Sequence, residues 1–134
     1  MIGSSCDRVI GKHVVRLMQS KQEELRTRTK KFALRIIRLF QNLPRSPEAQ
    51  IIGKQLLRSG TSVGANYRAA GRARSTAEFS AKIGVVVEEA DETVFWLECL
   101  VESGIVRPEL LGDLIKEANE LVAIFAASHR TVRN

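Results

Sequence analysis

Apolar residues recur at intervals of three and four along most of the chain, which is the period of an α-helix with one buried face. A first series starts at Leu25 and stops before Pro44, because proline lacks an amide donor and disfavours helical backbone in the residue before it. The sequence therefore predicts a first helix from Leu25 that ends ahead of Pro44. Its apolar positions are Phe32, Ala33, Ile36, Phe40 and Leu43.

A second helix is predicted from the segment "SPE" at residues 46–48. Ser46 is suited to the N-cap, Pro47 to the first turn and Glu48 to the positive end of the helix dipole. The apolar and small positions that follow form one face, which places the glycine-rich stretch inside a helix. That face comprises Ile52, Leu56, Ser59, Gly60, Val63, Tyr67 and Ala70.

Two more helices are indicated by their end signals. The segment "STAE" matches a capping box, in which Ser75 and Glu78 satisfy each other's free amides, so the preceding "AAGRAR" predicts a break. Gly104 ends the third helix and Pro108 begins the fourth. The third face comprises Phe79, Ile83, Val86, Ala90, Val94, Leu97 and Val101. The fourth comprises Leu111, Leu114, Ile115, Ala118, Leu121, Val122 and Phe125.

Four helical patterns with short connections and no strand pattern predict an all-α fold, an antiparallel up-down four-helix bundle. The bundle domain is expected over residues 21–131. Residues 1–20 form an N-terminal extension with two open alternatives, a disordered basic tail or a continuation of the first helix.

The stretch "SGTSVGANYR" at residues 59–68 could be a phosphate-binding loop or a packing surface. A phosphate-binding loop of the Walker type needs a preceding strand and a Gly-Lys-Ser/Thr ending, and this stretch has neither. Gly60 and Gly64 lie four residues apart, so the sequence favours a small-residue seam against another helix. Asn66 is expected to hydrogen-bond a neighbouring helix or loop, and Tyr67 to lie at the core edge or a subunit contact.

The two cysteines and the absence of a long apolar run narrow the class of protein. Cys6 and Cys99 are too few for a disulfide scaffold, which fits a reducing compartment. No signal peptide or membrane span is predicted, so we expect a cytoplasmic protein without membrane contact.

Charge is distributed unevenly around the net value of +6. Residues 21–45 hold eight Lys or Arg against two acids, whereas residues 75–107 hold two against seven. Helical phase collects the basic residues into one ridge on each of the first two helices, which suits an anionic partner such as nucleic acid. The predicted nucleic-acid-binding residues are Arg28, Lys31, Arg35 and Arg38, with Lys54, Arg58, Arg68 and Arg72.

Acidic residues of the third helix share an arc with a large aromatic side chain, which is more than solubility requires. This arc predicts a subunit interface, with a solvated face over the core edge as the alternative. The predicted interface residues are Asn66, Tyr67, Glu88, Asp91, Glu92, Phe95 and Trp96; Glu98 and Glu102 extend the arc.

Catalytic and metal chemistry find little support in the sequence. A di-metal bundle needs Glu-x-x-His pairs, and neither His13 nor His129 follows a Glu by three residues. No Ser or Cys has a His and a carboxylate nearby in sequence. We therefore expect no catalytic residues, metal ligands or cofactor.

The blocks "RSGTSVGANYR" and "EEADETVFWL" resemble the bacterial four-helix bundle family whose members include proteins encoded in intervening sequences of 23S rRNA genes. The resemblance covers residues 21–131. It implies a homo-oligomeric closed ring, a pentamer, with a distant likeness to accessory proteins of diversity-generating retroelements, which are basic rings that bind nucleic acid and a reverse transcriptase. The family commonly has Glu after "NYR", where this chain has Ala69.

Two functional hypotheses follow. The first is a non-enzymatic ring that binds RNA or another nucleic acid through its basic helix faces. The second is a protein-interaction adaptor, in which those faces serve only oligomer contacts. A steep dependence of nucleic-acid affinity on salt would separate them.

Overall fold

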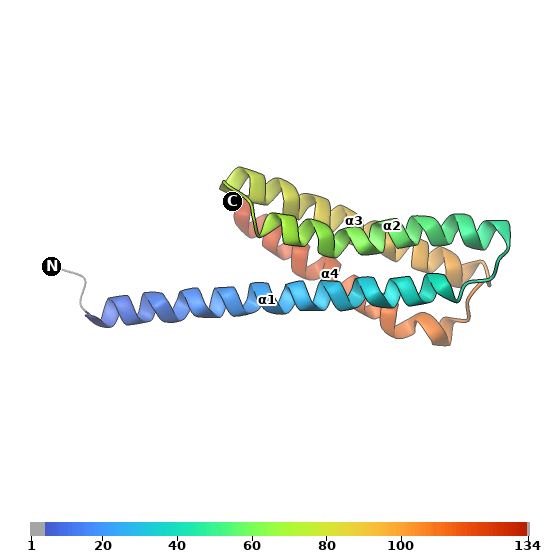
Figure 1. The fold of residues 1–134 in the computed structure, drawn as a ribbon, viewed down its shortest axis with the longest axis horizontal. Coiled ribbons are helices and arrows are strands. Elements are labelled where there is room, and N and C mark those ends of the chain that lie inside the picture. Colours follow the sequence, from blue (N-terminus) through green and yellow to red (C-terminus); the bar gives the residue numbers. More distant parts are fainter. Residues whose placement is uncertain (1–4, 134) are drawn as a thin grey trace.

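The computed structural model describes the backbone of residues 5–133 and the side chains of residues 11–132. It has four helices, α1 (Ser5–Gln41), α2 (Pro47–Ala70), α3 (Thr76–Glu102) and α4 (Pro108–Arg133). The described residues contain no strand, so the fold is all-α. Consecutive helices run in opposite directions (Figure 1), which is compatible with the antiparallel up-down bundle that the sequence predicts.

The helix ends follow the end signals closely, with one exception. The Ser75 hydroxyl accepts a hydrogen bond from the Glu78 amide at 3.1 Å, which is one of the two hydrogen bonds of the predicted capping box. Gly104 has a φ of 80°, a left-handed conformation that favours glycine after a helix. Ser46 occupies the N-cap of α2, but its side chain makes no cap hydrogen bond. The prediction of its position is therefore confirmed, although the side chain does not cap the helix.

The core lies between the inward faces of the four helices and contains the predicted apolar series. Its largest fully buried side chains include Phe32 and Ile36 of α1, Leu56 of α2, Leu97 of α3 and Phe125 of α4. Thr93 of α3 and Ser59 of α2 bring two hydroxyls within 3.0 Å of each other inside this core. Each hydroxyl also lies near a backbone carbonyl of its own helix, so the buried polar pair is satisfied.

The glycine-rich stretch is the surface on which α1 packs. A Cβ atom added to Gly60 would lie 2.8 Å from Cγ1 of Ile36, and one added to Gly64 would lie 3.3 Å from the backbone oxygen of Thr29. Both glycines therefore admit the close approach of α1. The prediction of a small-residue seam is confirmed, and its partner is the preceding helix.

Helix α1 is longer than its partners and projects past one end of the bundle (Figure 1). It has 37 residues, whereas α2 has 24. At about 1.5 Å per residue, the difference corresponds to roughly 20 Å of helix. Residues 5–20 are helical and continuous with α1, which is the second of the two alternatives for the N-terminal extension. Residues 1–4 lie outside the described part.

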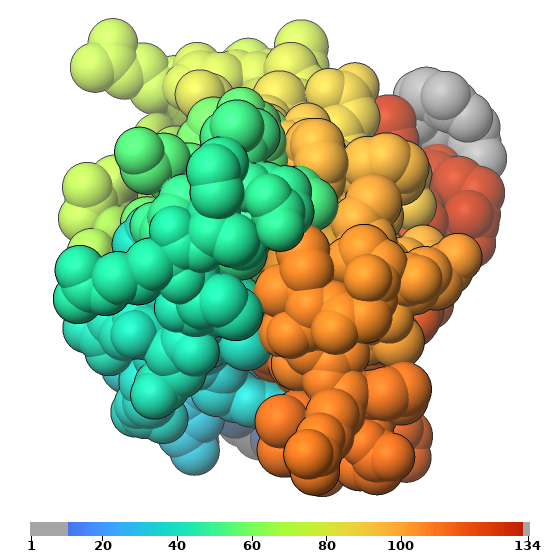
Figure 2. Space-filling view, turned by 90° about the vertical axis from the view of Figure 1, so that its right-hand side faces the viewer, coloured from blue at the N-terminus to red at the C-terminus, as the bar shows by residue number. Residues whose placement is uncertain are grey.

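The opposite end of the bundle carries two of the connections. The α1–α2 and α3–α4 connections lie side by side there, and Figure 2 shows the starts of α2 and α4 covering this end. The projecting part of α1 and the α2–α3 connection belong to the other end.

Candidate functional site

Helix α1 presents two different basic flanks, one toward α4 and one toward α2. Arg28 lies on the α4 side and is half-buried. Its guanidinium donates to Glu117 at 2.7 and 2.8 Å and to Glu120 at 2.7 Å. The hydrogen bond with Glu117 raises the pKa of Arg28 above its ordinary value, and Glu120 adds to this effect. Arg28 therefore joins α1 to α4. Helical phase alone had predicted that it projects freely, and this prediction is wrong.

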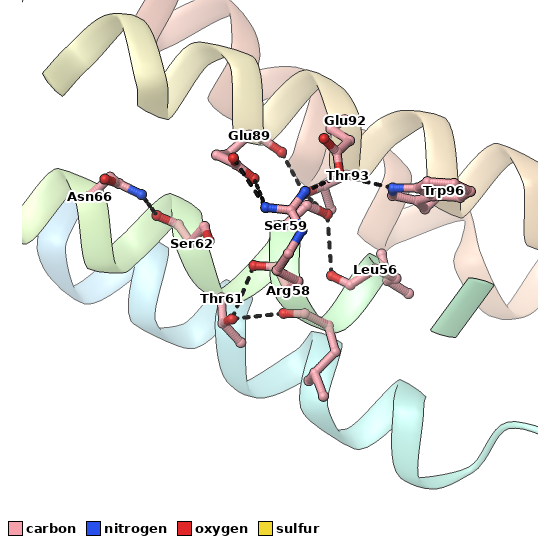
Figure 3. A network of polar contacts seen from close by, with 11 residues as sticks. Leu56, Arg58, Ser59, Thr61, Ser62, Asn66, Glu89, Glu92, Thr93 and Trp96 are labelled. Carbon is pink, nitrogen blue, oxygen red and sulfur yellow. Dashed lines mark hydrogen bonds and ion pairs between the residues drawn. The ribbon is translucent and has the colours of Figure 1, made fainter. Parts of the chain in front are cut away.

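Arg58 of α2 is paired in the same manner with α3. It donates to Glu89 at 3.1 Å and also contacts Glu92, and Figure 3 shows its guanidinium between these two carboxylates. Trp96 donates its indole N–H to Glu92 at 3.1 Å. This hydrogen bond, together with Arg58, lowers the pKa of Glu92. The predicted basic ridge of α2 thus loses Arg58 to a contact within the chain.

The other six predicted cations fall into two groups. Arg68 and Arg72 are exposed at the end of α2, where they face the α2-side flank of α1. The remaining four are dispersed over the outer surfaces of α1 and α2. They are Lys31, Arg38 and Lys54, which are exposed, and Arg35, which is half-buried.

A groove between α1 and α2 gathers four cationic side chains. One part, of about 300 Å³, is lined by Arg26 and Lys30 of α1 and Arg68 of α2, over small residues that include Gly64. A second part, of about 520 Å³, shares those three cations and adds Arg72. Because the parts share their walls, they form one groove, which we call the basic groove. Small floor residues keep it open, and the long side chains form its rims.

The basic groove is not neutralised from within the chain. Glu23 is the one acidic residue among those that line its two parts. Within residues 11–132, none of Arg26, Lys30, Arg68 and Arg72 forms an ion pair, unlike Arg28 and Arg58. The groove therefore combines four uncompensated positive charges with an open shape, which is the arrangement an anionic chain requires.

Arg26 and Lys30 were absent from the predicted ridge because they lie on the opposite flank of the buried face from Arg28 and Lys31. The sequence does hold a signal for them. Arg26 and Lys30 are four residues apart and line one side of α1, while Arg68 lies in the last turn of α2 and Arg72 just beyond it. In the structure, α1 packs on the glycine seam of α2 and this packing brings the two pairs together. The position of the seam could therefore have predicted the groove.

Tyr67 belongs to the core of its own chain. Its ring is buried and lies 5.1 Å from the ring of Phe125, at an interplanar angle of 48°. Burial raises the pKa of its hydroxyl, and the charge of Arg26 partly opposes that shift. The predicted place of its ring at the core is therefore confirmed, and its predicted part in a subunit interface stays a prediction.

Asn66 does not reach another helix. Its side-chain amide donates to the backbone oxygen of Ser62, one turn earlier in α2, at 2.9 Å (Figure 3). The expected hydrogen bond to a neighbouring helix or loop is therefore replaced by one within α2. This local bond satisfies the amide without fixing a contact between elements.

The outward face of α3 carries an exposed aromatic side chain among acids. Phe95 is 54% exposed and packs edge-on against Trp96, with ring centroids 4.9 Å apart. The exposed carboxylates within two turns of Phe95 are Glu88, Asp91, Glu98 and Glu102. We call these five residues the Phe95 face. Glu92 and Trp96 lie beside it and are engaged with Arg58, so they contribute less to an open surface.

The described residues contain neither a metal-ligand cluster nor a membrane-spanning helix. No group of three or more His, Cys, Asp or Glu side chains there could hold a metal ion. Within the same part of the chain, no helix has the length and apolar character needed to cross a membrane.

The fold and the basic groove define an all-α helical-bundle protein with a cationic surface. The chain belongs to the 23S rRNA-intervening sequence protein family, whose model matches residues 21–127. It is similar to a solved protein with unknown function from the S23 ribosomal protein family of Bacteroides thetaiotaomicron VPI-5482, with 32% identity and a TM-score of 0.76. That match covers 82% of this chain and 98% of the other. A search of curated proteins finds no match.

Proposed function

We propose that this protein is a non-enzymatic, cytoplasmic ring that binds RNA or another nucleic acid through the basic groove between α1 and α2. The observation that carries the proposal is the meeting of Arg26, Lys30, Arg68 and Arg72 around one groove without carboxylate partners within the described residues. Phosphate is the ligand that such an array suits best, because guanidinium groups bind its oxygens through charge-assisted hydrogen bonds.

The geometry of the groove suits a linear polyanion better than a compact anion. The α1 rim is a pair of cations four residues apart, so it runs along the axis of that helix, and the other rim consists of Arg68 of α2 and Arg72 just beyond its end. Successive phosphates of a nucleic-acid strand can lie between the two rims. Contacts of this kind depend little on base sequence, so binding is expected to be broad and sensitive to salt.

The assembly part of the proposal rests on the Phe95 face and on the family resemblance, which implies a pentamer. A phenylalanine that is 54% exposed within an acidic surface is suited to a contact between subunits. A ring would place several basic grooves on one particle. Several weak phosphate sites would then act together on one nucleic-acid molecule.

The experiment that tests the groove is a charge reversal at one residue on each rim. Arg26→Glu combined with Arg68→Glu should weaken the binding of a labelled single-stranded RNA of mixed sequence at least about tenfold, measured by fluorescence anisotropy. The matched control is Lys116→Glu with Arg130→Glu, which changes the net charge equally at exposed cations of α4. Equal losses in the two double variants would show that net charge, and not the groove, governs binding.

A second candidate, the interaction adaptor, is favoured by one observation. Arg28 and Arg58 each bind two carboxylates of another helix, so basic and acidic helix faces of this protein do pair. In the adaptor hypothesis the groove cations would meet acidic surfaces of neighbouring subunits. The Arg26→Glu, Arg68→Glu variant would then lose its native mass, and the wild-type protein would show no RNA affinity.

A further inference from the structure

The projecting part of α1 is a helix with an exposed apolar stripe. Residues 11–24 are all exposed, and we call this segment the overhang. Four of its apolar side chains lie largely in solvent, with exposures of 47% for Val14, 51% for Val15, 56% for Leu17 and 58% for Met18. Clustered apolar side chains at such exposure are characteristic of a surface that another molecule covers.

The stripe continues the buried face of α1 beyond the bundle. At about 100° per residue, Val14, Leu17 and Met18 fall within about 60° of the direction of Phe32, which is fully buried. Leu25, half-buried at the edge of the core, lies on the same line. From Val14 onward the helix therefore presents a core-type face, while α2 and α4 cover only its second half.

The overhang also has a distinct charge. Its outer part, residues 11–22, contains Lys12, Arg16 and Lys21 and no Asp or Glu, whereas Glu23 and Glu24 lie at its bundle end. Two overhangs packed against each other would bring these like charges together, which opposes that pairing. The partner of the overhang should instead present an apolar centre within a negative surface.

The Phe95 face has those properties. Its exposed phenylalanine is surrounded by the four carboxylates of Glu88, Asp91, Glu98 and Glu102. The overhang cannot reach this face in its own chain, since α1 packs on α2 and α4 and makes no contact with α3. A second copy of the chain can supply it.

We propose that the overhang of one subunit docks on the Phe95 face of the next subunit, with Val14, Leu17 and Met18 against Phe95. The contact is head-to-tail, because each subunit gives an overhang and receives another, and such contacts close into rings when the rotation allows. The proposal deepens the assembly part of the proposed function and rests on it. Val14, Leu17 and Met18 all lie before residue 21, where the family match begins, so they add a contact that the matched region does not contain.

The first test is chemical cross-linking between two full-length chains that each carry one cysteine. Both would have Cys6→Ser and Cys99→Ser; one adds Val15→Cys beside the apolar stripe, and the other adds Glu98→Cys one turn from Phe95. A short bis-maleimide should link the two chains when they are mixed, and should link neither chain to itself. Cross-linking of Val15→Cys chains to each other, or no cross-linking in an assembled mixture, would overturn the proposal.

The second test compares one added charge on two sides of the overhang. Leu17→Glu places a carboxylate on the apolar stripe and should weaken self-association at least about tenfold. Gln19→Glu places the same charge on the opposite side and should leave the native mass unchanged in light scattering. Equal behaviour of the two variants would contradict the docking. Neither substitution should reduce the helix content in far-UV circular dichroism, because both positions are exposed within one chain.

The native mass of the wild-type protein shows whether the ring itself or only the overhang contact is wrong. A wild-type monomer of 14.9 kDa would reject both the ring and this contact. An assembled wild type that keeps its mass in the Leu17→Glu variant would reject the contact alone. Binding of a monomeric wild type to vesicles of anionic phospholipid, lost in Leu17→Glu, would show that a membrane covers the stripe and would also overturn the proposal.

Discussion

The effect of a glycine on the stability of this fold depends on which atoms a Cβ atom at its position would meet. A Cβ atom at Gly60 would lie 2.8 Å from Ile36, a side chain that is fully buried and has no room to move. A Cβ atom at Gly112 of α4 would meet nothing within 4 Å. Helix propensity favours alanine over glycine by about 1 kcal/mol at both positions, so packing alone distinguishes them.

We therefore predict opposite signs for two identical substitutions. Gly60→Ala should destabilise the fold by about 1–3 kcal/mol, because the added methyl group overpacks the contact between α1 and α2. Gly112→Ala should stabilise it by up to about 1 kcal/mol. Thermal and urea unfolding measure both values, and a stabilised Gly60→Ala variant would show that α1 does not pack closely on this seam.

The Arg28 contacts lead to a prediction about pH. The hydrogen bond from Arg28 lowers the pKa of Glu117 below its ordinary value of 4.5. A carboxyl whose pKa is lower in the folded state adds stability that is fully present above its unfolded pKa and is lost as the pH falls through its folded pKa. The wild-type protein should therefore lose stability as the pH drops below about 4.5.

The matched variant is Arg28→Met, which keeps an unbranched apolar side chain and removes the charge. Its melting temperature should be lower than that of the wild type at pH 7, and the difference should shrink as the pH falls below about 4.5. A difference that stays constant between pH 7 and pH 3 would mean that packing, rather than the ion pair, stabilises this site.

At the scale of the helices, the sequence predicted correctly that there are four helices and where along the chain they lie. It predicted the hydrogen bonds at the helix ends less well. Proline, glycine and capping residues act over one turn, so they located the ends of α2, α3 and α4 within a few residues. The start of α1 was left open, and Ser20 with Glu23 shows why end signals can mislead there: the pair has the spacing of a capping box, yet the helix runs through it to Ser5. Ser46 was correctly placed at the N-cap of α2, but its hydroxyl makes no capping bond, since residue type indicates a cap position and does not fix the side-chain rotamer.

The two serine N-caps provide a direct comparison. Ser75→Ala should destabilise the protein by about 1 kcal/mol, because it removes the hydrogen bond to the Glu78 amide. Ser46→Ala should cost much less, because that side chain makes no cap hydrogen bond. Chemical unfolding of the two variants under identical conditions measures the difference, and equal losses would contradict the geometry at Ser46.

At the scale of the whole molecule, the candidate site depends on which helices are neighbours, and helical phase does not give that information. Phase alone grouped Arg28 with Lys31 and Arg58 with Arg68. Tertiary packing then placed Arg28 against α4 and Arg58 against α3, where carboxylates bind them. The same packing brought Arg26 and Lys30 to Arg68 and Arg72. The sequence therefore predicted a basic surface on α1 and α2, but it identified only Arg68 and Arg72 among the four cations of the basic groove.

The choice of residues for charge reversal therefore matters in a test of nucleic-acid binding. Arg58→Glu would place a third carboxylate beside Glu89 and Glu92, so its effect would mix folding with binding. Arg26 and Arg68 have no such partners among residues 11–132, so charge reversal there leaves the ion pairs of α1 with α4 and of α2 with α3 intact.

The most direct test of the central claim is the salt dependence of RNA affinity in the wild type and in the Arg26→Glu, Arg68→Glu variant. Each phosphate contact to a single strand contributes about 0.7 to the slope of log affinity against log salt concentration. Loss of two contacts per bound subunit should lower the slope by about 1.4, while the Lys116→Glu, Arg130→Glu control keeps the wild-type slope. An unchanged slope in the groove variant would contradict the assignment of the basic groove as the nucleic-acid site.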